Sequence, residues 1–159
     1  MGEPRKFADG TEVSAERSRA ELETLLRKHG ATEFGVFTSD EKTIFMYRLH
    51  GRMVRHVVSY PLASAVTTAR AQRGRTAEEQ LQRAREAEWR RRWRALVLVC
   101  KAKLEVIASG GSTFEREFLA DTLLPNGETV GEAMLPRIEE SYLSGGMPSF
   151  RMLGPGEGA

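Results

Sequence analysis

The sequence has few means of cross-linking itself or anchoring to a membrane. Among its 159 residues there is a single cysteine, Cys100, so a disulfide within the chain and a multi-cysteine metal site are both excluded. The longest strictly apolar run, residues 95–100, has six residues, far below the roughly 20 that a membrane-spanning helix needs. The N-terminus lacks the apolar stretch of a signal peptide. We therefore expect a cytoplasmic protein with no membrane contact.

Sequence signatures of enzymes are also missing. The chain has no phosphate-binding loop, dinucleotide-binding motif or nucleophile-elbow motif. Cys100 lies in an apolar segment, where a buried thiol has a raised pKa and is unreactive. His50 and His56 supply only two of the three or four ligands that a metal site needs, and ordinary sheet histidines explain them better. We expect no enzyme activity, no catalytic residue, no metal and no cofactor.

Charge is unevenly distributed, although the net charge is only +2. Residues 1–47 carry 7 basic and 9 acidic side chains, residues 48–103 carry 14 and 4, and residues 104–159 carry 3 and 9. Every basic residue of the middle segment except Lys101 and Lys103 is arginine, whose guanidinium binds phosphate and carboxylate in a bidentate manner. The middle segment fits an anionic partner, but the acidic C-terminal third could also neutralise it within the chain.

The spacing of apolar and turn-forming residues predicts an α+β fold. Aromatic and β-branched residues between turn formers predict a three-stranded antiparallel meander, with strands at about 32–38, 43–50 and 53–60. Capping residues and helical spacing predict an N-terminal helix, one long helix and two shorter C-terminal helices, beginning near Ser14, Thr76, Ser112 and Thr129.

The organisation of the chain is expected to be simple. We predict a single domain at 14–145, a flexible leader at 1–13 and a C-terminal tail at 146–159, whose glycine- and proline-rich end is expected to be frayed. The long helix, about 76–108, is charged almost all round in its first half and apolar almost all round in its second. The second half is therefore expected to form core, while the first half projects or packs on a partner.

Three stretches of the sequence carry a resemblance to other proteins. They are ERSRAELETLLRKHGA (16–31), RWRALVLVCKAKLEVIASG (92–110) and TFEREFLADTLLPNGETVGE (113–132). They resemble a family of small uncharacterised proteins from phage and prophage genomes, and the likeness covers roughly residues 14–145. No activity is established for that family, so the resemblance transfers no functional residue. It implies an accessory phage protein in the bacterial host cytosol, where such proteins often handle nucleic acid or bind a host protein.

Nucleic-acid binding is the function that the arginines favour. On the long helix they recur at spacings of seven and four, which places them in neighbouring stripes, and others lie on the sheet and in the loop before the helix. A basic helix of this kind neutralises several phosphates at once, and since no base-recognition motif is present, binding to DNA or RNA is expected to be backbone-directed. The candidate residues are Arg48, Arg52, Arg55, Arg70, Arg73, Arg75, Arg83, Arg85, Arg90, Arg91, Arg92 and Arg94.

A protein-binding module is the alternative function. Trp89 and Trp93, with arginine neighbours on the same helix, have the composition of an interface hot spot. Two such helices could pair as a homodimer, or the helix could bind an acidic host protein as an inhibitor or adaptor would. Ionic strength separates the two hypotheses, because phosphate binding weakens steeply as salt rises.

Overall fold

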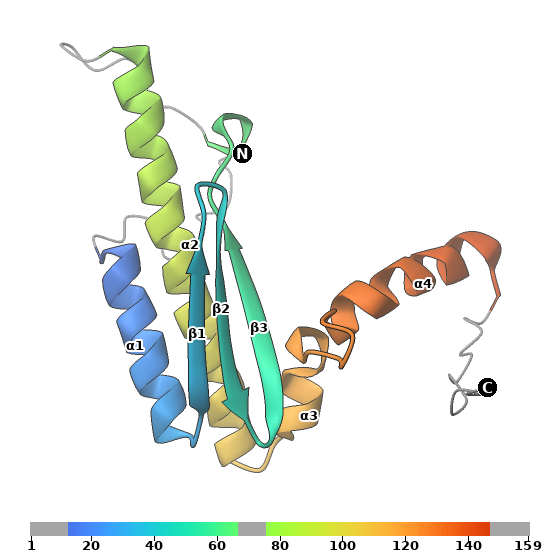
Figure 1. Cartoon of the computed structure of the whole chain (residues 1–159). Coiled ribbons are helices and arrows are strands. Elements are labelled where there is room, and N and C mark those ends of the chain that lie inside the picture. The colour runs from blue at the N-terminus through green and yellow to red at the C-terminus, as the bar shows by residue number, and fades with distance from the viewer. Residues whose placement is uncertain (1–12, 67–75, 147–159) are drawn as a thin grey trace, which may run out of the picture.

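The computed structural model of the chain describes residues 13–66 and 76–146. A three-stranded sheet carries two helices on one face, and the C-terminal helix leads away from it (Figure 1). The elements are α1 (Ala15–Lys28), β1 (Thr32–Thr38), β2 (Lys42–Leu49), β3 (Arg52–Ser59), the 3-10 turn η1 (Ala63–Ala65), α2 (Ala77–Ala108), α3 (Phe114–Glu117), the 3-10 turn η2 (Leu119–Asp121) and α4 (Val130–Ser144). The predicted α+β fold is confirmed, and no strand boundary differs from its prediction by more than one residue.

The sheet is an antiparallel meander in the order β1-β2-β3. His50 and Gly51 form the β2–β3 turn with φ values of 49° and 75°, which is the combination that a tight hairpin turn requires. This turn sets the register in which Phe45 lies opposite His56 and Ile44 opposite Val57. Because side chains alternate along a strand, the first pair faces the helices and the second faces outward.

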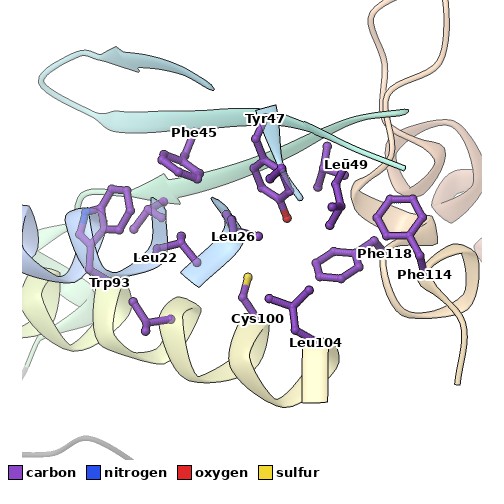
Figure 2. Close-up of a cluster of buried hydrophobic side chains, with 14 of the residues drawn as sticks. Leu22, Leu26, Phe45, Tyr47, Leu49, Trp93, Cys100, Leu104, Phe114 and Phe118 are labelled. Carbon is purple, nitrogen blue, oxygen red and sulfur yellow. The ribbon is translucent and has the colours of Figure 1, made fainter. Parts of the chain in front are cut away.

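The hydrophobic core lies between the sheet and the two helices α1 and α2. Figure 2 shows aromatic side chains of β2 pointing toward leucines of α1 and toward the second half of α2. The phenylalanines of the α3 region close one end of this core. Its labelled members are Leu22, Leu26, Phe45, Tyr47, Leu49, Trp93, Cys100, Leu104, Phe114 and Phe118.

Helix α2 has the two unlike halves that the sequence predicts. Its 32 residues span about 48 Å. The capping box between Thr76 and Glu79 is present and fixes where the helix begins. All of its buried residues lie from Trp93 onward, namely Trp93, Val97, Cys100 and Leu104. The first half therefore contributes no fully buried side chain to the core.

One predicted helix start is wrong. Thr113, not Ser112, is the N-cap of α3, and its hydroxyl accepts a 3.4 Å hydrogen bond from the Arg116 amide. The Ser112 amide is still engaged with the end of α2, since it donates to the Val106 carbonyl. The second capping box, between Thr129 and Glu132, is confirmed and opens α4.

Candidate functional site

The arginines in the middle of α2 are largely paired with acidic side chains of the same chain. Arg91 Nε lies 2.7 Å from Glu88 Oε2, and Arg92 Nε lies 3.2 Å from Glu88 Oε1. The hydrogen bond from Arg91 lowers the pKa of Glu88, outweighing its partial burial. Arg94 Nη1 lies 2.6 Å from Glu21 Oε2 on α1. Part of the predicted basic stripe is thus neutralised inside the fold.

Two α2 arginines also bind backbone carbonyls where β3 ends. Arg85 Nε donates to the Pro61 carbonyl at 2.8 Å, and its guanidinium lies 4.7 Å from the centre of the Tyr60 ring. Arg92 Nη1 donates to the Ser59 carbonyl at 2.8 Å. These contacts fasten the first half of α2 to the chain that follows the sheet. They give Arg85 and Arg92 a structural role.

Arg83 and Arg90 are differently placed. They lie seven residues apart on one stripe of α2, and neither pairs with a carboxylate among the residues that the structure describes. Arg83 is exposed, whereas Nε of the half-buried Arg90 is shielded from solvent and has no hydrogen-bond partner within the same residues. These two arginines of the predicted stripe therefore have no ion pair within the described ranges.

The three sheet arginines have three different environments. Arg48 Nε lies 2.8 Å from Glu33 Oε1. Arg55 forms an ion pair with Glu132 of α4. Arg52 is exposed, and together with Arg48 it lines an open groove of about 490 Å³ at the β2–β3 hairpin. The rest of the groove lining is mainly apolar and comes from Gly51, Met53 and residues within 115–130.

The loop arginines Arg70, Arg73 and Arg75 lie outside the described residues. The described residues contain 18 lysines or arginines and 18 aspartates or glutamates, so they carry no net positive charge. Over the described residues, acidic side chains therefore balance the excess of arginine in the middle of the chain. The acidic C-terminal third supplies only part of this balance, through the pairs Arg55–Glu132 and Lys103–Asp121. The paired arginines of α2 bind Glu88 and Glu21, which lie outside that third.

The two tryptophans of the predicted protein interface differ in burial. Trp93 is 2% exposed and packs edge-to-face against Phe45, with ring centres 6.4 Å apart. Trp89 is half-buried between Tyr60 and Trp93, at 5.4 and 5.9 Å. The assignment of Trp93 to an interface is corrected, because this side chain fills the core of its own chain. Trp89 presents only part of its ring to solvent.

A buried polar cluster lies on the inner face of the sheet, and the spacing of residues in the sequence does not predict it. His56 Nε2 lies 3.1 Å from the Tyr47 hydroxyl oxygen and 3.8 Å from Cys100 Sγ. On the other side of the ring, His56 Nδ1 lies 3.7 Å from Asp121 Oδ1. The second carboxylate oxygen of Asp121 is 3.2 Å from Lys103 Nζ. The cluster joins β2, β3, α2 and η2.

The order cysteine, histidine, aspartate resembles a nucleophile with its base and orienting acid. Burial removes the reactivity, however, because it raises the pKa of Cys100 to about 12 and leaves the thiol with no solvent-exposed surface. Burial likewise raises the pKa of Tyr47 far above its usual value. Burial also acts against ionisation of Asp121, but the neighbouring His56 and Lys103 side chains lower its pKa overall. The cluster is thus a polar connection within the core.

Several large apolar side chains of α4 are exposed. No residue of this helix is buried, and Figure 1 shows it leading away from the sheet and from the other helices. Leu135 and Tyr142 are 64% and 87% exposed. Ile138 lies between them, so the three residues occupy positions i, i+3 and i+7 of one helical face. Leu143 borders this face and is also exposed. We call Leu135, Ile138 and Tyr142 the α4 stripe.

The outer face of the sheet is the second uncovered surface. Phe37 lies opposite Ile44, and Ile44 lies opposite Val57, so the three side chains form a row across the strands on the face away from α1 and α2. Phe37 is 63% exposed and Val57 is also exposed. Met46 extends the apolar area along β2, and Lys42 ends it. We call Phe37, Ile44, Met46 and Val57 the outer sheet patch.

Comparison with protein-family models, with curated proteins and with solved structures finds no match to this chain. Across 13–66 and 76–146, no group of three or more histidine, cysteine, aspartate or glutamate side chains is arranged to hold a metal ion. Within those ranges, no helix combines the length and the hydrophobicity needed to cross a membrane.

Proposed function

We propose that this protein is a non-enzymatic protein-binding module and that its binding surface is the apolar face of α4. The observation that carries the proposal is a helix of 15 residues with no buried residue and several large exposed apolar side chains. A helix of this length is marginal in water by itself, and most helical stability in proteins comes from packing an apolar face. A partner that covers α4 supplies that packing.

The spacing of the α4 stripe fits a known mode of recognition. Amphipathic helices that lie in a partner's groove insert side chains at positions i, i+3 or i+4, and i+7. Leu135, Ile138 and Tyr142 have this spacing. Tyrosine is enriched at the centre of protein interfaces, because its ring buries a large area while its hydroxyl finds a polar partner. The stripe therefore has the composition as well as the geometry of a binding helix.

The buried cluster supports the non-enzymatic part of the proposal. Its thiol is fully buried and its histidine is nearly so, and both make hydrogen bonds or close polar contacts inside the core. A nucleophile needs contact with substrate and a depressed pKa, and Cys100 has neither. The resemblance to uncharacterised phage proteins adds a setting for the proposal, namely an accessory protein in an infected bacterial cell.

A photo-crosslinking amino acid at position 142 tests the proposal directly. We expect irradiation of the whole protein, alone and in an extract of its native cells, to join position 142 to a second polypeptide. The matched control is position 62, because Leu62 is 70% exposed and lies outside both uncovered surfaces. Crosslinking at 142 but not at 62 supports a binding helix. Equal yields at the two positions, or none at 142, overturn the proposal.

Nucleic-acid binding is the second candidate, and one observation favours it. Arg83 and Arg90 share a stripe of α2 without a carboxylate partner among the described residues. Fluorescence anisotropy of labelled DNA and RNA at two salt concentrations tests this candidate. Binding through Z phosphates of duplex DNA gives a slope of log affinity against log salt of about −0.9Z.

The Arg83→Glu variant tests whether nucleic acid binds to this stripe or to other basic groups of the protein. Arg17→Glu, which reverses a charge on α1, is the matched control. Weaker binding and a shallower slope for Arg83→Glu alone support the stripe. Absence of binding at low salt contradicts the candidate, and equal loss in both variants assigns binding to overall charge instead.

A further inference from the structure

No other described residue covers the α4 stripe or the outer sheet patch, and the two surfaces do not cover each other within one chain. Helix α4 begins beside β3, where Arg55 of the sheet binds Glu132 of its first turn, and then leads away from the strands (Figure 1). The inner face of the sheet is already occupied by α1 and α2. Within residues 13–66 and 76–146, the chain therefore has a helix whose apolar face packs on nothing and a sheet face that no helix covers.

We propose that the α4 stripe of one copy docks on the outer sheet patch of a second copy, and that the second copy returns the same contact. This inference rests on the proposed function and names the partner of the binding helix. A contact in which each copy gives a helix and receives one is isologous, so it closes at two copies instead of growing into a filament.

The dimensions of the two surfaces agree. The α4 stripe, from Leu135 to Tyr142, spans about 10 Å at a rise of about 1.5 Å per residue. The row formed by Phe37, Ile44 and Val57 crosses three strands and also spans about 10 Å, because neighbouring strands lie about 4.8 Å apart. A helix laid across the strands therefore places the stripe along the row.

The chemistry of the two surfaces is complementary. Both have an apolar centre, in which Leu135, Ile138 and Tyr142 meet the row formed by Phe37, Ile44 and Val57. Glu139 borders the stripe on α4, and Lys42 lies at the end of the patch on the same face of β2. The Lys42 side chain has no ion pair within the described part of the chain. Docking pairs an acidic border with a basic one.

Sedimentation velocity of the full chain at micromolar concentrations tests the dimer. We expect the unaltered protein to sediment with the mass of two chains, and Tyr142→Asp and Phe37→Asp each to sediment as one. The matched controls are Leu62→Asp, which makes the same kind of change at an exposed residue outside both surfaces, and Ser144→Asp, which adds the same charge off the α4 stripe. Both controls are expected to remain dimeric.

Mixing the two monomeric variants gives the sharpest test. A heterodimer of Phe37→Asp and Tyr142→Asp has one contact with both surfaces intact and one with both altered. The mixture is therefore expected to regain dimers that neither variant forms alone. Circular dichroism checks that each variant is folded. If Phe37→Asp fails that check, Val57→Ser on the patch, paired with Ile138→Asp on the helix, repeats the test with smaller disturbance of the sheet.

Several outcomes overturn the inference. The unaltered protein could be monomeric throughout, form larger assemblies, or form a dimer that survives both substitutions. If one of these results is obtained and position 142 still crosslinks to a different protein, the second copy is rejected as the partner. The proposal that α4 is a binding helix then stands. A lack of crosslinking at 142 rejects the binding helix as well. The two proposals therefore fail in distinguishable ways.

Discussion

Arg55 of β3 and Glu132 of α4 form an ion pair that joins the outer face of the sheet to the first turn of the C-terminal helix. The same guanidinium donates a 3.1 Å hydrogen bond to the Gly127 carbonyl in the turn before that helix. A hydrogen bond from the Thr129 backbone amide contributes most to the lowered pKa of Glu132, and the nearby charge of Arg55 adds to it. These contacts fix the direction in which α4 leaves the domain.

Glu132→Gln isolates the ion pair from the helix cap, because glutamine retains the reciprocal capping hydrogen bonds. We expect amide hydrogen exchange across 130–144 to become faster while exchange in α1 stays the same. Glu140→Gln, on the exposed part of the same helix, is the matched control. Unchanged exchange in Glu132→Gln means that the cap alone holds the start of α4.

Leu104→Ala tests the assignment of the second half of α2 to the core. Leu104 is buried beside Cys100 and the phenylalanines of the α3 region, so its truncation is expected to cost about 2–5 kcal/mol in the free energy of unfolding. Leu62→Ala changes an exposed leucine and is expected to stay within about 0.5 kcal/mol. Urea denaturation measures both. Equal losses in the two variants are incompatible with the core described here.

The fold could be predicted from the sequence because its signals are local. The limits of α2 follow from the Thr76 capping box and from apolar spacing that continues to Ala108. The strands follow from turn formers such as Gly51, which has a positive φ. The capping motif at Ser112 predicts the wrong start for α3, because the Ser112 amide binds the end of the preceding helix and the motif does not reveal such a competing contact.

The candidate surfaces depend on contacts between distant parts of the chain. Arg94 and Glu21 are 73 residues apart, and His56 and Cys100 are 44 apart, so spacing along the sequence could not reveal either contact. Arginine content was therefore an incomplete guide to surface charge. The spacing of Leu135, Ile138 and Tyr142 was visible in the sequence, but only the fold shows that the described chain leaves this stripe uncovered.

The stability of the protein at acid pH is expected to depend on Asp121. Its pKa is lower in the folded chain than the usual carboxyl value of about 3.9. The ionised form therefore stabilises the fold fully above the unfolded pKa, and this stabilisation is lost as pH falls through the folded pKa. Asp121→Asn should be less stable at neutral pH and should lose less further stability on acidification.

Thermal melts between neutral pH and pH values below the usual carboxyl pKa measure this difference. Asp40→Asn, in the exposed β1–β2 turn, is the control and should keep the acid dependence of the unaltered protein. If the melting temperatures of Asp121→Asn and of the unaltered protein fall equally as the pH is lowered, the carboxylate at position 121 does not stabilise the fold.

Cys100 provides a direct measure of how closed the core is. Its thiol has no exposed surface and a pKa raised to about 12, so at mildly alkaline pH it is both inaccessible and protonated. A disulfide reagent such as dithionitrobenzoate attacks thiolates, and we expect it to leave the native protein unmodified but to react fully in guanidinium chloride. A slow native reaction should speed up in Leu104→Ala, because that variant opens the core more often. Rapid, complete modification of the folded protein would instead show an open path to the Cys100–His56–Asp121 cluster, and the case against catalysis at that cluster would fall.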